Sequence, residues 1–301
     1  MRALIIYFSV TGTTRRVARS IAAGLEDAGA EVSLLELPAA QWPDARDFDL
    51  IGIGFPVHWY RMPTPVCDAI DSLGQLGGRL AFVFALHGTY RGAGLNRARA
   101  ALHRAGAVEV GVFTCHGEGS FLGYLRLGHQ FSTGHPDEVD LAAASDFGRM
   151  LPDACAAAAA GAPPLVPPPD PRTHWVYAIE RAVVAPWLVR SFYRRCFHTD
   201  PGLCTRCGKC ARACPTHSIV WHKGEIPVWG AGCIMCLTCA LVCPEAAVHS
   251  PIDWPVFRPF LRYNIRRAAR DAALVHSLVE LRRGVIVHRD REREEGRVLQ
   301  S

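Results

Sequence analysis

Residues 204–215 have the sequence CTRCGKCARACP, and residues 233–244 repeat its pattern as CIMCLTCALVCP. Both runs follow Cys-x2-Cys-x2-Cys-x3-Cys-Pro, and they begin 29 residues apart (233 minus 204). The similarity extends beyond the cysteines, because Ala211 corresponds to Ala240 and the apolar Ile219 corresponds to Val248. This part of the chain is therefore an internal repeat organised around thiols.

Thiols at this spacing are typical ligands of [4Fe–4S] clusters. Three thiolates two residues apart can surround one face of an iron–sulfur cube, and the fourth ligand must come from elsewhere. In two-cluster proteins the distant cysteine of each run binds the other cluster. We therefore predict two [4Fe–4S] clusters, one bound by Cys204, Cys207, Cys210 and Cys243, the other by Cys233, Cys236, Cys239 and Cys214.

Other uses of these cysteines fit less well. A zinc ribbon usually has two Cys-x2-Cys pairs and does not require a third cysteine at the same step. A disulfide framework requires an oxidising compartment, to which nothing in the sequence points. A single degraded or three-iron cluster is the remaining alternative. The chain has 12 cysteines, and we expect the four outside the runs to be buried, reduced thiols: Cys67, Cys115, Cys155 and Cys196.

Length and composition indicate a two-domain globular protein. The chain has 301 residues, of which 50% are hydrophobic and 20% charged. The first apolar segment, Ala3–Phe8, is too short for the core of a secretory signal. No stretch has the uncharged length of a membrane span. We therefore expect a cytoplasmic protein without a transmembrane segment, and we expect no nucleic-acid partner.

Charge is distributed unevenly along the chain. Residues 1–170 contain 13 Lys and Arg and 17 Asp and Glu, a balance of −4, whereas residues 171–301 contain 20 and 11, a balance of +9. Such halves can dock on each other, or the basic half can face an acidic partner. Arg262, Arg266 and Arg270 recur every four residues on an expected helix, either as a solvated face or as such a dock. The Ala-rich apolar side of that helix argues against peripheral membrane contact.

The first part of the chain alternates short apolar runs with amphipathic segments, which predicts a doubly wound α/β sheet of five parallel strands. The expected strands are 3–8, 32–37, 50–55, 80–86 and 108–114. The expected helices between and after them are 13–28, 65–73, 92–105 and about 136–159.

A Pro-rich linker is expected to separate this domain from the cysteine runs. The predicted organisation is a first domain at 1–160, a linker at 161–172, a second domain at 173–285 and a charged tail at 286–301. The second domain is expected to have a helix over 174–197 with Pro186 as a kink, a cluster core at 200–249, and a long helix over 260–283.

A turn rich in hydroxyl groups joins the first expected strand to the first helix. Hydroxyl and backbone N–H groups converge there at the positive end of a helix, which suits a phosphate. A simple helix cap has the same composition, but the position directly after strand one of a doubly wound sheet favours a ligand. The candidate phosphate ligands are Ser9, Thr11, Gly12, Thr13 and Thr14.

Two further loops follow the carboxyl ends of strands, where open α/β sheets bind their ligands. Trp59, Tyr60 and Tyr90 could stack on a flat ring system, although single aromatic residues more often pack in a core. The candidate residues of these loops are Pro56, Val57, His58, Trp59, Tyr60, His87, Gly88 and Tyr90.

These motifs resemble a known family. Residues 1–115 are similar to a flavodoxin, in which the Ser-x-Thr-Gly-Thr-Thr turn would bind the phosphate of FMN and the other two loops would flank its ring system. With the cysteine runs, the whole chain resembles bacterial flavodoxin–ferredoxin fusion proteins. One departure is that the loop 56–60 has no glycine, whereas many flavodoxins place Gly or Asn beside the flavin. Residues 52–57 lack the third glycine of a dinucleotide fingerprint, so we expect no NAD(P)H site.

The resemblance implies an electron-transfer protein that passes electrons between two clusters, FMN and a protein redox partner. An alternative is an FMN-dependent oxidoreductase that reduces a small acceptor such as a quinone, and another is a cluster-based redox sensor or scaffold. No catalytic constellation stands out in the sequence, and whether the protein is an enzyme stays open. Near the flavin only His58 or His87 could donate a proton to an acceptor, and a packing role fits them better.

Overall fold

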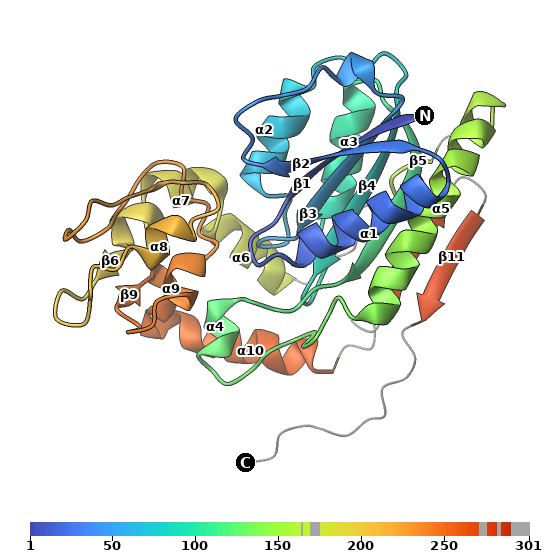
Figure 1. Ribbon diagram of the computed structural model, residues 1–301. Coiled ribbons are helices and arrows are strands. Elements are labelled where there is room, and N and C mark those ends of the chain that lie inside the picture. The colour runs from blue at the N-terminus through green and yellow to red at the C-terminus, as the bar shows by residue number, and fades with distance from the viewer. Residues whose placement is uncertain (164, 169–174, 271–275, 282–283, 290–301) are drawn as a thin grey trace.

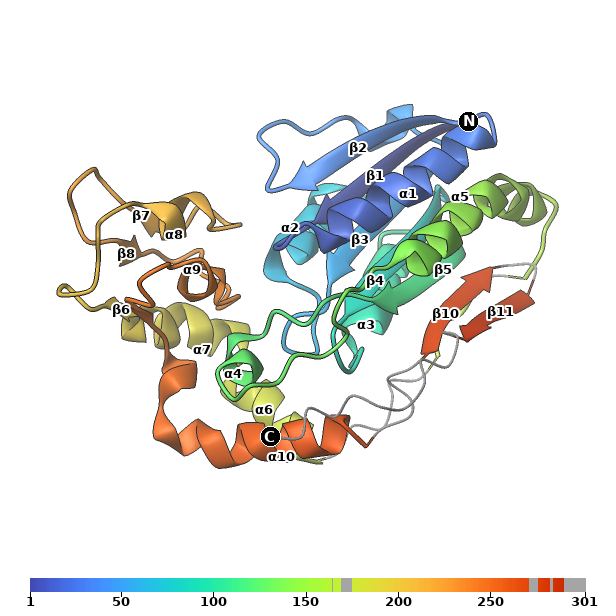
Figure 2. The same cartoon turned by 60° about the horizontal axis from the view of Figure 1, so that its bottom comes forward.

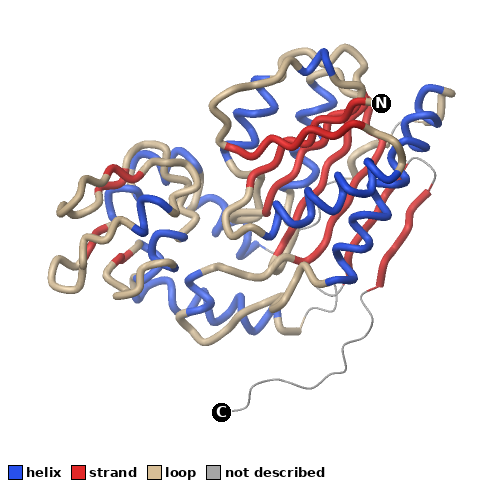
Figure 3. The backbone as a smooth tube through the Cα atoms, in the orientation of Figure 1, coloured by secondary structure: helices blue, strands red, loops and turns tan. Residues whose placement is uncertain are grey.

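The structure is a computed structural model that describes residues 1–163, 165–168, 175–270, 276–281 and 284–289. Five parallel strands form its central sheet in the order β2-β1-β3-β4-β5, which confirms the predicted doubly wound architecture (Figures 1 and 3). The strands are β1 (Arg2–Phe8), β2 (Glu31–Leu37), β3 (Leu50–Pro56), β4 (Leu80–His87) and β5 (Val108–His116).

Helices cover both faces of the sheet, because alternate residues of each strand are apolar on opposite sides. In β1, Ile5 and Tyr7 pack toward one pair of helices, whereas Leu4 and Ile6 pack toward the other pair. The first pair is α1 (Thr13–Asp27) and α5 (Glu138–Ala159), and the second is α2 (Thr64–Ser72) and α3 (Gly94–Arg104). A 3-10 turn, η1 (Ala45–Asp47), precedes β3.

The C-terminal half contains a small module built around the two cysteine runs, beside the carboxyl ends of the sheet strands (Figures 1 and 2). Its elements are α6 (Trp175–Val183), α7 (Pro186–Ser191), η2 (Tyr193–Cys196), β6 (His198–Thr199), α8 (Lys209–Arg212), β7 (Ile219–Val220), β8 (Val228–Trp229), α9 (Thr238–Leu241), β9 (Val248–His249), η3 (Pro251–Asp253), η4 (Pro255–Phe257) and α10 (Arg258–Ala268). The expected helix over 174–197 is interrupted rather than kinked, since α6 ends at Val183 and Pro186 begins a new helix. Residues 169–174 of the expected linker and helix start lie outside the described residues.

The predicted long helix over 260–283 is wrong. Helix α10 ends at Ala268, and two strands follow: β10 (His276–Leu281) and β11 (Gly284–Arg289). Strand β10 pairs antiparallel with β5, so the described sheet has seven strands and these segments lie in the first domain rather than in the cysteine module. The apolar spacing of this region fitted a helix, but its β-branched residues and the open edge of β5 favour strand pairing.

The charged tail was expected to begin at 286, yet residues 286–289 belong to β11. The rest of that tail lies outside the described residues.

Candidate functional site

The backbone of the two cysteine runs repeats at the same interval as their sequence. Arg206 and Met235 have φ of 55° each, and Gly208 and Leu237 have φ of 68° and 64°. His217 and Ala246, which are also 29 positions apart, have φ of 48° and 49°. Left-handed backbone at non-glycine residues costs free energy and is typical of ligand sites. The two runs therefore form two equivalent binding loops.

Each loop opens a hollow that is lined by three cysteines of one run and the distant cysteine of the other. The first hollow is lined by Cys204, Cys207, Cys210 and Cys243. The second is lined by Cys214, Cys233, Cys236 and Cys239. Burial raises the pKa of Cys239 to about 12, and its neighbours Cys236, Cys233 and Cys214 contribute to the rise. The structure thus brings together the two crosswise sets that the spacing predicts.

The spacing of the thiols fits a cluster better than a single zinc ion. Tetrahedral zinc with Zn–S bonds of about 2.3 Å would hold its sulfur atoms roughly 4 Å apart. Among the described residues, one group of at least three His, Cys, Asp or Glu side chains has its ligand atoms within 4.8 Å of one another. This group is His135, Asp137 and Asp140, and it contains no cysteine. That group is part of the capping of α5, in which Asp137 and Asp140 form a capping box. Neither cysteine set is compact enough for one zinc ion.

No disulfide joins any of the twelve cysteines, all of which lie within the described residues. Outside the two sets, Cys115 and Cys155 are buried, as predicted, whereas Cys67 and Cys196 are only partly buried.

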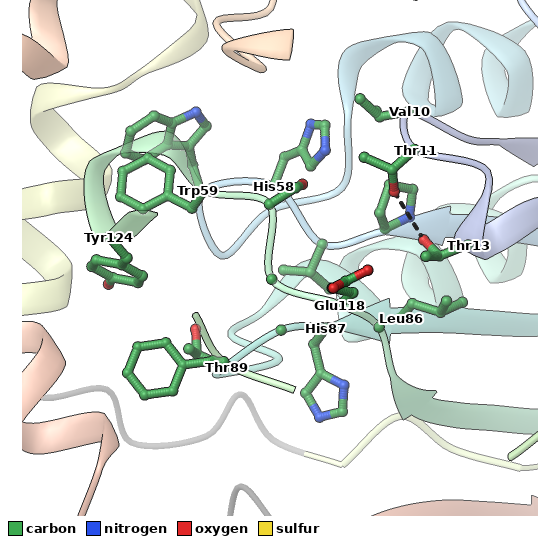
Figure 4. Close-up of a pocket in the computed structure, with 18 of the residues that line it drawn as sticks. Val10, Thr11, Thr13, His58, Trp59, Leu86, His87, Thr89, Glu118 and Tyr124 are labelled. Atoms are coloured by element: carbon green, nitrogen blue, oxygen red, sulfur yellow. Dashed lines mark hydrogen bonds between the residues drawn. The ribbon is translucent and has the colours of Figure 1, made fainter. Parts of the chain in front are cut away.

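A third, larger hollow of about 150 Å³ lies at the carboxyl ends of the sheet strands (Figure 4). Thr11 and Thr13, whose hydroxyl oxygens are 3.3 Å apart, lie at one end of it, and Trp59 and Tyr124 lie at the other. Ten predicted residues line it: Thr11, Thr13, Pro56, Val57, His58, Trp59, Tyr60, His87, Gly88 and Tyr90. Three predicted residues do not line it: Ser9, Gly12 and Thr14. Ser9 and Gly12 lie in the turn before α1, and Thr14 lies in the first turn of that helix.

The start of α1 fits a phosphate group. Gly12 is the N-cap residue of the helix, with φ of 86°, and has no side chain that could cap the helix end. Thr14 is fully buried, and its hydroxyl oxygen has no hydrogen-bond partner among the residues that the structure describes. A buried unpartnered hydroxyl is costly, and a phosphate oxygen would supply the missing partner. Ser9 instead accepts a weak hydrogen bond from the backbone N–H of Arg15 (3.4 Å) and supports the turn.

The loop after β3 is a tight turn with an unusual backbone. His58 and Arg61 exchange two backbone hydrogen bonds of 3.0 and 2.8 Å. The central residues Trp59 and Tyr60 have φ of 49° and 60°, so two non-glycine residues adopt the left-handed conformation of a type I′ turn. Tyr60 is buried. Trp59 packs edge-on against Phe121, with the two ring centroids 4.9 Å apart.

Neither loop histidine is arranged to supply a proton at neutral pH. Burial lowers the pKa of His58 to about 4, and burial together with the neighbouring His116 lowers the pKa of His87 to about 3. The Nδ1–H of His87 donates to the carbonyl oxygen of Cys115 (2.9 Å). Figure 4 shows the two rings pointing to opposite sides of the hollow. Packing roles therefore fit both residues.

Sequence reasoning missed two parts of this hollow. One is the loop after β5, which contains α4 (Leu122–Leu125) and contributes Glu118, Phe121, Tyr124, His129 and Phe131. Its position after a fifth parallel strand could have predicted it. The other part is Met235 and Cys236, from the second cysteine run. No signal in the sequence indicates that this run approaches the sheet.

Comparison with known proteins finds one family match in each half of the chain. Residues 4–116 match the family model of a flavodoxin domain, and residues 197–220 match that of a 4Fe-4S binding domain. The second match contains only the first cysteine run. No helix among the described residues is long and apolar enough to cross a membrane.

Solved structures similar to the chain include a flavodoxin from the domain Archaea, with 17% sequence identity and a TM-score of 0.42 over 52% of this chain and 99% of that chain. The flavodiiron core of Flv1 from Synechocystis sp. PCC6803 is 18% identical, with a TM-score of 0.42 over 52% of this chain and 36% of that chain. A flavodoxin of Streptococcus pneumoniae TIGR4 is 19% identical, with a TM-score of 0.40 over 51% and 99% of the two chains. No curated protein matches the chain.

Proposed function

We propose that the chain passes electrons between two [4Fe–4S] clusters and one FMN. It joins a flavodoxin domain to a 4Fe-4S binding domain, and the two together indicate an electron-transfer flavo/iron–sulfur protein. When bound, the clusters supply one-electron transfer and FMN supplies two-electron capacity. The chain then exchanges electrons with a separate protein. The proposed location is the cytoplasm, because cysteines without disulfides are typical of that reducing compartment.

One observation carries this proposal: Cys236 lines both the hollow of the second cysteine set and the hollow assigned to FMN. A cluster held by that set would therefore be separated from the flavin by a single side chain. Phe121, Leu122 and Tyr124 from the flavodoxin domain pack with this part of the module, which keeps the two hollows adjacent. We call the set of Cys214, Cys233, Cys236 and Cys239 the proximal set.

The other set, Cys204, Cys207, Cys210 and Cys243, is the distal set, and it is the more accessible of the two. Cys207 is exposed. Arg206, Lys209 and Arg212 are exposed around it, and no ion pair joins them to a described acidic residue. We call these three residues the basic collar. Charge of one sign around an exposed redox centre attracts a partner of the other sign. An acidic redox protein is therefore the proposed partner at the distal set.

Counting metal and electrons tests the cofactor content. Reconstituted protein should contain about eight irons, eight acid-labile sulfides and one FMN. Anaerobic titration should take up about four electrons per chain, one for each cluster and two for FMN. Cys207→Ala should lower the iron to about four while the flavin absorbance stays unchanged. About four irons in the fully reconstituted wild type would contradict the two-cluster proposal, and zinc in stoichiometric amount would indicate a ribbon instead.

A further inference from the structure

A small cavity of about 40 Å³ lies where the flavodoxin domain meets α6 and α7. It is lined on one side by the turn after β3 and the start of α2, including Arg61, Pro63 and Thr64. On the other side it is lined by α7, including Arg190, and by Cys233 of the proximal set. A volume of about 10–15 Å³ is needed for one water. The cavity can therefore hold a few waters or one small polyatomic ion.

Two arginines, Arg61 and Arg190, line this cavity. Within the described part of the chain, no Asp or Glu lines it. Arg61 donates through its terminal nitrogen to the carbonyl oxygen of Arg181 and so lies against a second arginine. Burial, with the neighbouring positive charges of Arg181 and Arg97, lowers the pKa of Arg61. The folded chain thus brings like charges together at a partly dehydrated interface, which is unfavourable unless an anion is present.

The arginines also retain unused donors. The buried Nε of Arg61, which lines the cavity, has no hydrogen-bond partner among the described residues. The same holds for the buried Nε of Arg181, which lies against Arg61 but does not line the cavity. A guanidinium group offers its nitrogens as a planar fork that matches carboxylate and phosphate oxygens. Helix α2 begins at the cavity with Thr64 after Pro63, and no side chain caps this helix end. The helix end adds a positive dipole to the positive side chains.

From these observations we propose that the cavity between Arg61 and Arg190 is a binding site for a small oxyanion, a phosphate or a carboxylate, that bridges the two halves of the chain. Arg61 belongs to the flavodoxin domain, whereas Arg181 and Arg190 belong to α6 and α7 of the cysteine module. The bound anion offsets the repulsion among the arginines. It thereby fastens α6 and α7 to the turn of Trp59, which borders the same cavity.

The test uses FMN-loaded protein, so that the phosphate turn before α1 is already filled. Inorganic phosphate and acetate are titrated separately at constant ionic strength, and binding is followed by calorimetry and by the melting temperature. We expect saturable binding of at least one of the two anions. The anion that binds more tightly indicates whether the natural ligand is a phosphate or a carboxylate. Arg61→Gln and Arg190→Gln should each weaken it at least tenfold. Arg104→Gln, which removes an exposed positive charge on α3, is the matched control and should bind as the wild type does.

Hydrogen exchange tests the bridge itself. The preferred anion should slow exchange both in residues 58–64 and in residues 181–190. Slower exchange in only one of these two segments would overturn the bridging role. The site itself would be overturned if neither anion bound saturably, or if the wild type and the three variants bound the anion equally well. None of these measurements requires electron transfer, so their failure would leave the proposed function untouched.

Discussion

The indole Nε1–H of Trp59 donates a hydrogen bond to the main-chain oxygen of Met235, 3.2 Å away. This bond joins the turn after β3 to the left-handed segment of the second cysteine run. Cys236, the next residue, lines the flavin hollow. The bond therefore fixes the proximal set against the loop that would flank the flavin ring, and both partners use strained backbone to reach it.

Thr14→Val should change apoprotein stability and FMN affinity in opposite directions. In the apoprotein, valine removes a buried hydroxyl without a partner, so the melting temperature should stay equal or rise. With FMN, the variant loses a hydrogen bond to a charged phosphate, worth about 1.5–3 kcal/mol. Fluorescence quenching should then show at least a tenfold loss of affinity, with the cluster absorbance unchanged. Thr11→Val is the comparison, because Thr11 is exposed. A larger loss of FMN affinity in Thr11→Val than in Thr14→Val would argue against Thr14 as the main phosphate ligand.

The basic collar should control the rate of electron exchange with an acidic redox protein. Replacing Arg206, Lys209 and Arg212 with Gln should slow the exchange at low ionic strength and flatten its dependence on salt, because steering by opposite charges is screened by ions. Stopped-flow mixing with an acidic ferredoxin or flavodoxin as the probe measures both effects.

The exposed arginines of α10 and its end provide a control with the same change in charge. Arg262, Arg266 and Arg270 have no ion pair with a described residue, and they lie on the element that the sequence proposed as a dock. Changing these three to Gln should alter the rate less than changing the collar does. The reverse order would place the partner on α10 and away from the distal set.

The buried histidine beside the flavin hollow should make the protein less stable in acid. In the unfolded chain His87 takes up a proton near pH 6.5, but in the folded protein only near its lowered pKa of about 3. The unfolded state therefore gains protons first as the pH falls, and stability decreases between about pH 6.5 and pH 3. His87→Asn keeps a donor for the Cys115 carbonyl but does not titrate. Its melting temperature should fall less than that of the wild type between pH 7 and pH 5, and equal falls would show that His87 does not contribute.

The sequence predicted the parts of this protein that local patterns determine. The five parallel strands follow from short apolar runs, and the crosswise cysteine sets follow from their spacing. It did not predict the ends of α10 and the two added strands, because Leu261, Ile265 and Val279 fit a helical repeat as well as strand pairing. The open edge of β5 decides between them, and that edge exists only in the folded sheet.

The contact between the halves was equally invisible in the sequence. Met235 occupies a position between two cysteines, where any residue would fit the motif. Its contact with Trp59 joins residues 176 positions apart. The left-handed backbone of Trp59 and Tyr60 was also unforeseen, because the sequence offers no glycine where the turn requires positive φ.

Flash photolysis of the anaerobic holoprotein can show whether electrons pass between the clusters and FMN within one chain. A light-generated reductant is chosen that reacts at the exposed distal set, and cluster and flavin absorbance are followed separately. When the electron enters at the distal set, we expect flavin reduction to follow cluster reduction with a rate that does not depend on protein concentration. We also expect Trp59→Phe, which removes the hydrogen bond to Met235, to slow that step. A rate proportional to protein concentration, or a flavin that stays oxidised while the clusters are reduced, would contradict the proposed transfer.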